Sequence, residues 1–292
     1  MVPTKERNQS GVLIRHGSEG ILIDCGEGTQ RQFKKARVSP TKITRLLITH
    51  WHGDHVLGIP GLLQTLSFND YKRTLFIYGP KGLKKNIENV LKAFPSVMVS
   101  DRMKGLKIKV EEVDGKFLET EEFYIESRKM NHGIASNAYI FVKKGQRRID
   151  KKKLRKSKLP HTPIIQKLKE GKNIKYKGKK YLAKNLTYME GEKKISFVLD
   201  TAKNERIIPF VKNSDLLIME SSYSDELKSL AKKHKHMTVK QVAEISKRAK
   251  VKKLFLTHLS ERYERNFEKI LKESKQIFRN SHLAKDLDSV EI

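Results

Sequence analysis

Short apolar runs alternate with longer amphipathic stretches along most of the chain. Runs rich in Leu, Ile, Val and Phe are typical of β-strands, whereas apolar residues at helical spacing indicate helices. The strand-like runs are Leu46–Ile48, Phe123–Met130, Ile195–Leu199 and Leu254–Thr257. The helix-like stretches are Val56–Phe68, Gly82–Phe94, Val239–Ala249, which follows a capping-box pattern at Thr238 and Gln241, and a charged segment after Tyr263. Two sheets with helices on their outer faces would bury all these apolar faces, so the pattern predicts an α/β fold, an αββα sandwich.

A dense cluster of metal-ligating side chains follows the first of these strands. After Ile48 the chain reads Thr-His-Trp-His-Gly-Asp-His, which places three imidazoles and a carboxylate within six residues. A tight loop at a strand end can point His50 and His52 at one ion, while Asp54 and His55 reach a second ion about 3.5–4 Å away. The cluster therefore predicts metal chemistry.

Further ligand types stand at the ends of the other predicted strands. Asp200 follows Ile195–Leu199, His258 follows Leu254–Thr257, and His132 follows the stretch that ends at Met130. A lone His or Asp is more often a solvated loop residue. Catalytic residues, however, gather at the ends of elements on a rigid scaffold. Together with the first cluster, the three residues favour one site with two metal ions.

Basic residues outnumber acidic residues, and the excess is unevenly distributed along the chain. The 62 Lys and Arg residues against 33 Asp and Glu residues give a formal net charge of +29 and a pI near 10.0. Residues 143–195 alone hold 20 basic and 4 acidic residues. A localised excess indicates a docking surface for a polyanion such as a nucleic acid. The alternative is a set of lysine-rich loops that are merely solvated.

The same basic segment also interrupts the succession of strands and helices, because it is rich in Lys and Gly and has few apolar runs. We expect one domain over residues 1–292, with residues 143–195 inserted as a basic arm. Tyr176, Tyr181 and Tyr188 lie among its lysines. They either stack on nucleotides or pack in a small core of the arm.

The cysteine content and the hydropathy of the chain bear on its compartment. Cys25 is the single cysteine, which excludes a disulfide framework and suits a reducing compartment. The sequence has no recognisable signal peptide and no apolar stretch of membrane-spanning length. We therefore expect a cytoplasmic protein with no membrane partner.

Three further stretches, taken with the metal cluster, resemble the RNase Z family of tRNA 3′-processing endonucleases, within the metallo-β-lactamase superfamily. They are Pro3-x-Lys5-x-Arg7-Asn8, the glycine-bearing segment Asp24-Cys25-Gly26-Glu27-Gly28-Thr29-Gln30-Arg31-Gln32, and Thr257-His258-x-Ser260-x-Arg262-Tyr263. The resemblance runs almost the whole length of the chain. It implies the metallo-β-lactamase sandwich, precursor tRNA as the substrate, and an arm that docks the tRNA elbow.

The resemblance also implies a cofactor, namely two zinc ions per chain, with manganese as the alternative metal. The residues that it assigns to the metals are His50, His52 and His132 for one ion, Asp54, His55 and His258 for the second, and Asp200 as the bridge between them.

The catalytic roles come from the same resemblance. Asp54 is expected to orient the attacking hydroxide as well as to ligate. His236 stands in a His-Met-Thr stretch similar to the family's His-Ser-Thr motif, and is the candidate proton donor for the leaving oxygen. Glu220 matches the Glu of the family's His-Glu-Ala-Thr motif and would orient His236, although Met219 replaces the first His of that motif.

Three basic residues of the matching stretches are expected to bind the substrate. Arg262 would clamp a phosphate, and Lys5 and Arg7 would meet the acceptor stem. Family relatives usually begin with a short strand before the stretch that contains Lys5, so either this chain lacks that edge strand or its start has been assigned late.

These observations predict a zinc-dependent endoribonuclease that removes the 3′ trailer from precursor tRNA and leaves a tRNA 3′-hydroxyl. By analogy with the family we expect a homodimer. One alternative is a related two-metal hydrolase of small phosphodiesters or thioesters, which would not need the basic arm. Another is a metal-stabilised RNA-binding protein without catalysis, which would be expected to have lost Asp54 or Asp200.

Overall fold

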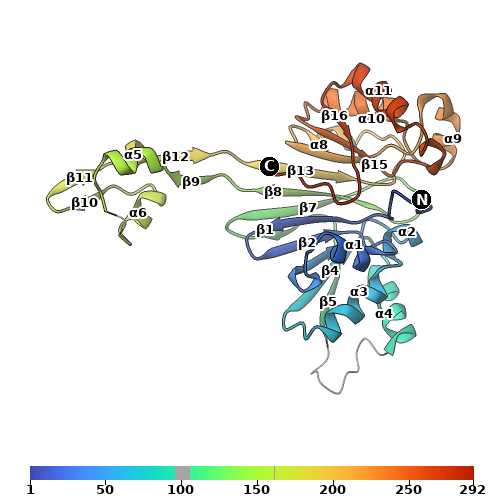
Figure 1. Ribbon diagram of the computed structural model, residues 1–292, viewed down its shortest axis with the longest axis horizontal. Helices are drawn as coiled ribbons and strands as arrows, with labels where there is room; N and C mark the ends of the chain where they lie inside the picture. The colour runs from blue at the N-terminus through green and yellow to red at the C-terminus, as the bar shows by residue number, and fades with distance from the viewer. Residues whose placement is uncertain (96–105, 161) are drawn as a thin grey trace.

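Two β-sheets face each other at the centre of the protein, which a computed structural model describes at residues 1–95, 106–160 and 162–292 (Figure 1). The five-stranded sheet has the order β1 (Val12–His16), β2 (Glu19–Ile23), β3 (Arg45–Leu47), β4 (Thr74–Gly79) and β5 (Lys107–Glu112). The seven-stranded sheet has the order β16 (Ser281–Leu283), β15 (Leu254–Thr257), β14 (Leu216–Glu220), β13 (Lys193–Val198), β8 (Asn137–Lys143), β7 (Phe123–Lys129) and β6 (Gly115–Glu119). In the second sheet, β16 to β13 are parallel and β13 to β6 are antiparallel.

Alternation of side chains along each strand separates an inner layer from an outer one. In β2, Ile21 and Ile23 pack between the two sheets, whereas Leu22 packs against the helices outside. In β8, Phe141 belongs to the inner layer and Ile140 to the outer one. Because successive residues of a strand point to opposite faces, these strands contribute side chains both to the core between the sheets and to the core beneath the helices.

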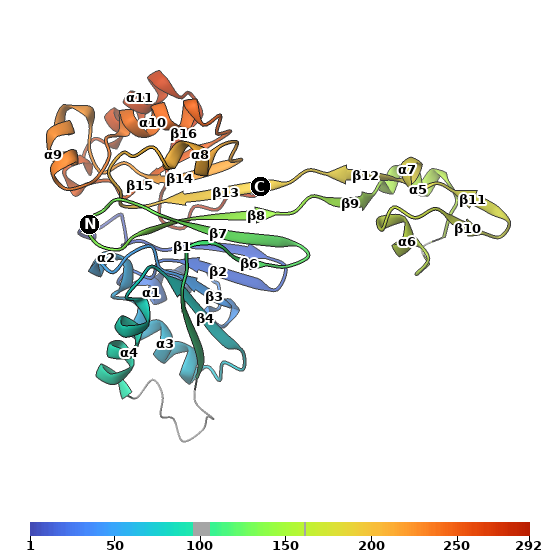
Figure 2. The ribbon, with the colours of Figure 1, turned by 180° about the vertical axis from the view of Figure 1, so that it is seen from behind.

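Helices cover the outer face of each sheet (Figures 1 and 2). The first sheet is covered by α1 (Thr29–Lys35), α3 (Ile59–Phe68) and α4 (Leu83–Ala93), and the second by α8 (Ile207–Val211), α10 (Val239–Arg248) and α11 (Phe267–Ile277). The remaining turns of helix on the sandwich are α2 (Gly53–Val56), α9 (Lys228–Lys233) and the 3₁₀ segments Pro40–Lys42, Asp225–Leu227 and Glu261–Tyr263. The predicted four-layer αββα sandwich is confirmed. Within the described residues, no helix has the length and apolar character that crossing a membrane requires.

The helix starts agree with the sequence in one case and depart from it in another. Thr238 and Gln241 do form a reciprocal capping box at the start of α10. The single helix expected over Val56–Phe68 is wrong, because the chain forms α2 and α3 with a break at Gly58. A Cβ at Gly58 would lie 2.1 Å from the carbonyl oxygen of Gly26, and Pro60 fits only the first turn of a helix.

Residues 144–192 leave the sandwich as a long projection, which we call the arm (Figure 2). Its neck is a two-stranded antiparallel ribbon, β9 (Gln146–Ile149) with β12 (Thr187–Glu190). Its head consists of α5 (Lys151–Lys156), α6 (Ile165–Lys169), β10 (Ile174–Tyr176), β11 (Lys179–Tyr181) and α7 (Ala183–Leu186).

The head of the arm has a small hydrophobic core of its own, built around side chains such as Leu154 and Leu168. Tyr181 is buried in this core and Tyr176 packs against it, so packing is the right interpretation for these two residues. Tyr188 differs, because it lies on the neck and is 53% exposed. It pairs across the ribbon with Arg148.

Candidate metal centre

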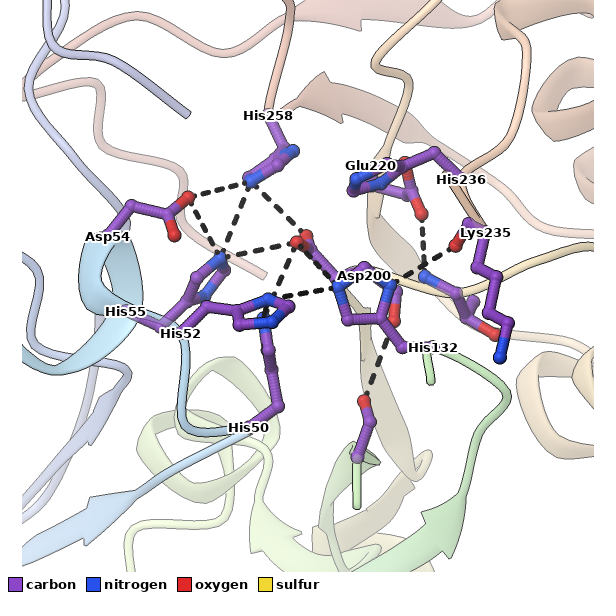
Figure 3. A network of polar contacts seen from close by, with 12 residues as sticks. His50, His52, Asp54, His55, His132, Asp200, Glu220, Lys235, His236 and His258 are labelled. Atoms are coloured by element: carbon purple, nitrogen blue, oxygen red, sulfur yellow. Dashed lines mark hydrogen bonds and ion pairs between the residues drawn. The ribbon is translucent and has the colours of Figure 1, made fainter. Parts of the chain in front are cut away.

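The ends of four strands bring the predicted ligands together at one edge of the sandwich (Figure 3). His50, His52, Asp54 and His55 follow β3, and His132, Asp200 and His258 follow β7, β13 and β15. β13 and β15 run in the same direction, and β7 runs parallel to β13 because both are antiparallel to the strand between them. The carboxyl ends of all three strands therefore meet at the same edge.

Sharp turns of the backbone aim some of these side chains. Asp200 and His258 adopt left-handed backbone conformations, with φ of 41° and 53°, within two residues of the ends of their strands. Such angles are uncommon for residues other than glycine, and they are concentrated at functional sites. Asp24, which follows β2 in the same way, has φ of 57°.

The first group of donor atoms contains three imidazole nitrogens and one carboxylate. His52 Nδ1 lies 3.0 Å from His50 Nε2 and 3.2 Å from His132 Nε2. Asp200 Oδ2 lies 3.5 Å from His50 Nε2 and 3.6 Å from His132 Nε2. All four ligand atoms lie within 4.8 Å of one another.

The second group shares Asp200 with the first. Asp54 Oδ2 lies 3.1 Å from His258 Nε2 and 3.3 Å from His55 Nε2, and these two nitrogens are 3.4 Å apart. Asp200 reaches His55 Nε2 at 3.5 Å through Oδ2 and His258 Nε2 at 3.3 Å through Oδ1. The amino group of Met1 also forms an ion pair with Asp54.

The donor set fits a pair of divalent cations. Asp200 Oδ1 is buried and has no hydrogen-bond partner among the described residues, and the imidazole nitrogens face one another across short gaps. Buried polar atoms normally have a partner, so a cation among them would satisfy the whole set. Nitrogen and carboxylate donors in this proportion suit zinc.

Burial and neighbouring charges set the protonation states of the ligands. Burial, with repulsion from neighbouring histidines, lowers the pKa of His50 to about 2, which leaves its imidazole neutral. Burial alone would raise the pKa of Asp200, yet attraction by His258 and His55 holds it well below its usual value. For His55, Asp200 and Asp24 outweigh burial and raise the pKa, so a bound cation would displace a proton from this side chain.

The ligands are held from behind by further side chains. Asp24 accepts hydrogen bonds from the Thr49 backbone nitrogen at 2.7 Å and from the Thr49 hydroxyl at 2.8 Å, and it lies 2.7 Å from His55 Nδ1. His132 Nδ1 lies 3.2 Å from the carbonyl oxygen of Lys235. These contacts fix the ring orientations and leave the opposite nitrogens free to ligate. The sequence assigned no role to Asp24, although its place directly after the apolar run of β2 was an available signal.

His236, which is half-buried, and Glu220, which is buried, form a pair beside the candidate ligands (Figure 3). His236 Nδ1 lies 2.9 Å from Glu220 Oε2, and its ring centroid is 4.9 Å from that of His132 and 5.5 Å from that of His258. Burial opposes a charge on His236, but the Glu220 carboxylate raises the pKa of the imidazole above its usual value. Met219, where the related motif has a histidine, packs into the core between the second sheet and its helices.

The expected substrate residues lie in different surroundings. Lys5 is exposed, and the exposed Arg262 places its guanidinium 5.3 Å from the ring centroid of Tyr223. The guanidinium of Arg7 has partners within the protein. It donates a hydrogen bond of 2.7 Å to the carbonyl oxygen of Ala284 and lies 4.5 Å from the ring centroid of Phe267, so it ties the N-terminal loop to the C-terminal part of the chain.

Comparisons with known proteins place the chain among metal-dependent hydrolases. Residues 4–136 match the Metallo-beta-lactamase superfamily. Ribonuclease Z of Nanoarchaeum equitans is 35% identical over 293 residues, which cover 99% of this chain and 90% of that protein. Ribonuclease Z of Methanosarcina acetivorans is 34% identical over 294 residues, which cover 100% of this chain and 94% of that protein.

A solved structure extends the likeness to three dimensions. The short form of human tRNase Z superposes with a TM-score of 0.69 at 25% sequence identity, and the match covers 100% of this chain and 96% of that chain. The match in three dimensions therefore extends along the whole chain.

Proposed function

This chain belongs to the ribonuclease Z family, and from that premise we propose that it removes the 3′ trailer from precursor tRNA as a metal-dependent endoribonuclease. The observation that carries the proposal is the convergence of seven metal-ligating side chains, with the His236–Glu220 pair beside them, at one edge of the sandwich.

We propose two zinc ions per chain. His50, His52 and His132 would hold one ion, Asp54, His55 and His258 would hold the other, and Asp200 would contact both. Ions bound there lower the pKa of water and neutralise charge on the attacked phosphodiester. The excess of imidazole over carboxylate favours zinc, with manganese as the alternative.

The protein's own groups then have two tasks in the reaction. Asp54 orients the attacking water, because its carboxylate stands at the edge of the second group and stays ionised. His236 donates a proton to the 3′ oxygen of the mature tRNA as the bond from that oxygen to phosphorus breaks. Glu220 accepts the Nδ1 proton of His236, so Nε2 is the nitrogen that faces the leaving oxygen.

We propose that the arm binds the body of the tRNA, through charge and through one exposed aromatic ring. Residues 143–195 carry 20 basic and 4 acidic residues, which attract the phosphate backbone. Tyr188 offers an exposed ring on the neck next to Arg148, whose Nε donates a hydrogen bond of 3.0 Å to Glu190. A fixed guanidinium beside a free ring suits the stacking of a base.

Two residues on the sandwich are proposed phosphate contacts near the cleavage site. Arg262 stacks on Tyr223, whose ring centroid is 6.1 Å from that of His236, so the guanidinium lies close to the proposed proton donor. Lys5 extends from the N-terminal loop into solvent.

A homodimer and a cytoplasmic location stay predictions. Light scattering coupled to gel filtration measures the first, and a mass near 33.8 kDa would exclude a stable dimer.

One experiment tests the central proposal. Purified protein is incubated with a precursor tRNA that carries a 3′ trailer, with and without a metal chelator, and the products are sequenced. We expect a single cut that leaves a 3′-hydroxyl on the tRNA, and loss of cleavage with the chelator that zinc restores. Hydrolysis of a small phosphodiester without cleavage of precursor tRNA would support the alternative hydrolase instead.

A further inference from the structure

A third group of titratable side chains lies behind the metal centre and surrounds one serine hydroxyl. Glu220, His236 and His258 offer donor atoms that are close enough together to hold a metal ion. However, the Ser222 hydroxyl already lies among them, 2.8 Å from Glu220 Oε2, 3.0 Å from His258 Nδ1 and 3.3 Å from His236 Nδ1. The group is therefore a hydrogen-bonded cluster around Ser222 rather than a third metal site.

The protons in this cluster have a single consistent arrangement. A carboxylate only accepts, so the one proton of the Ser222 hydroxyl is donated to Glu220. His258 directs Nε2 into the donor group that would hold the second ion, beside Asp54 and Asp200, and a ring that ligates through Nε2 carries its proton on Nδ1, where it donates to Ser222. The nearer acceptor for the Nδ1 proton of His236 is Glu220, at 2.9 Å.

We propose that Ser222 is a positioning residue that relays the negative charge of Glu220 to His258 and thereby holds this ring as a ligand of the second metal ion. The proposal rests on the function proposed above. One carboxylate then serves two histidines, His236 by direct contact and His258 through the hydroxyl. An outer contact of this kind orients a ligating ring and makes its free nitrogen a better donor to metal.

Loss of the Ser222 hydroxyl would weaken the support of His258 while leaving the pair of Glu220 and His236 in place. Glu220 keeps hydrogen bonds from His236 and, at 2.6 Å, from the backbone nitrogen of Thr201, so its pair with His236 persists. His258 Nδ1 has no other hydrogen-bond partner than Ser222 among the described residues. Because Ser222 is buried, water does not readily replace the lost partner.

Size-matched variants at this position give the test. Ser222→Thr keeps the hydroxyl, Ser222→Val has the shape of threonine without it, and Ser222→Ala simply removes it. We expect wild-type protein and Ser222→Thr to retain two zinc ions per chain after dialysis against a weak chelator. Ser222→Val and Ser222→Ala should retain about one, with affinity for the second ion about 10–100-fold weaker. Atomic absorption and competition with a chromogenic chelator measure the two quantities without RNA.

The neighbouring serine is the matched control. Ser221 is equally buried, but its hydroxyl donates to the carbonyl oxygen of Thr257, so Ser221→Ala should retain both ions. The proposal is overturned if Ser222→Val binds both ions as tightly as Ser222→Thr, or if Ser221→Ala loses an ion equally. If the Val variant fails to fold by circular dichroism, the Ala and Thr pair decides in the same way. Failure of wild-type protein to cut precursor tRNA would overturn the proposed function, but would leave the metal measurements standing.

Discussion

At the scale of single residues, some side chains of the centre are in the protonation state that binds a cation before any cation is bound. Burial lowers the pKa of His50, and nearby histidines lower that of Asp200, so both residues are already in the form that ligates. The left-handed backbone at Asp200 and at His258 aims these two side chains at the cluster. Such conformations are costly and persist only where surrounding packing enforces them, which the rigid strand ends provide here.

The role of Asp54 can be tested by removing its carboxylate. Asp54→Ala should lower cleavage of precursor tRNA by about 10²–10⁴-fold, because a ligand and an orienting group are lost together. Binding of the tRNA should be nearly unchanged, since the arm lies away from the cluster. A cleavage assay alongside nitrocellulose filter binding measures both.

The matched control for this variant is Asp114→Ala, which removes an exposed carboxylate whose single ion-pair partner among the described residues is Lys129. It should leave cleavage at the wild-type rate. Cleavage by Asp54→Ala at more than about a tenth of the wild-type rate would contradict the assigned role.

The shared position of Asp200 leads to a second prediction. Its two oxygens contact ligands of both groups, so Asp200→Ala should reduce the binding of both ions rather than one. Atomic absorption on dialysed protein measures the stoichiometry. A wild-type protein that holds only one tight zinc ion would remove the bridging role from this residue.

The sequence indicated the seven candidate ligands because each follows a recognisable strand within a few residues. It missed Asp24 and Ser222, whose roles depend on contacts with residues far away in the chain, such as His55 and His258. Arg7 shows the opposite limitation. The sequence identifies Arg7 only as a basic residue in a stretch that resembles a substrate loop, and the fold is needed to reveal its hydrogen bond to Ala284.

At the scale of helices and strands, the pattern of apolar residues was a good guide where elements are long. Alternation in β7 and the capping box of α10 were readable, because each involves neighbours in sequence. The break between α2 and α3 was not, since it arises from the close approach of Gly58 to Gly26. The elements in the head of the arm are too short to give a period, so the sequence predicted a small core there only as one of two interpretations of its tyrosines.

One carboxylate at the start of β14 ties two strands together and predicts a pH effect on stability. Asp215 accepts hydrogen bonds of 2.8 Å from the backbone nitrogen of Lys194 and from Lys252 Nζ. Burial alone would raise its pKa, but these bonds outweigh burial and the pKa lies below its usual value. The stabilisation is therefore complete above the pKa of the unfolded chain, and it is lost as the pH falls through the folded pKa.

Asp215→Asn should accordingly lower the free energy of unfolding at neutral pH by about 1–3 kcal/mol. The difference from wild type should stay constant down to about pH 5 and shrink below about pH 4. Urea unfolding across this range measures it. Asp114→Asn, at an exposed ion pair, should cost less than about 1 kcal/mol at any pH. If the difference in free energy of unfolding between wild type and Asp215→Asn grew larger in acid, the assigned direction of the Asp215 pKa shift would be wrong.

At the scale of the whole molecule, substrate binding and chemistry occupy separate places. The ligands lie at the edge where β7, β13 and β15 end, whereas the arm leaves from the opposite ends of β8 and β13 (Figure 1). The two functions should therefore be separable by mutation.

Replacing residues 144–192 by a short Gly/Ser turn should raise KM for precursor tRNA by about tenfold or more. The salt dependence of tRNA binding should also become weaker, because each lost phosphate contact lowers the slope of log K against log salt by about 0.7–0.9. Hydrolysis of bis(p-nitrophenyl) phosphate should be unchanged. Tyr188→Ala, compared with Tyr188→Phe, isolates the contribution of the ring. Wild-type affinity and salt slope in the arm-less protein would show that the arm is only a solvated basic loop.

The register between β8 and β13 makes such exchanges feasible in general. Lys143 pairs directly with Lys193, so the chain leaves the sandwich and returns to it at two adjacent points of one antiparallel ladder. Whatever is inserted there leaves the path of both strands intact, and the entropic cost of a longer insertion grows only slowly with its length. The arm is thus an insertion between two paired strands. Grafting a different RNA-binding head onto the same two points should redirect the nuclease to new transcripts, while the candidate metal centre at the opposite ends of the strands is unchanged.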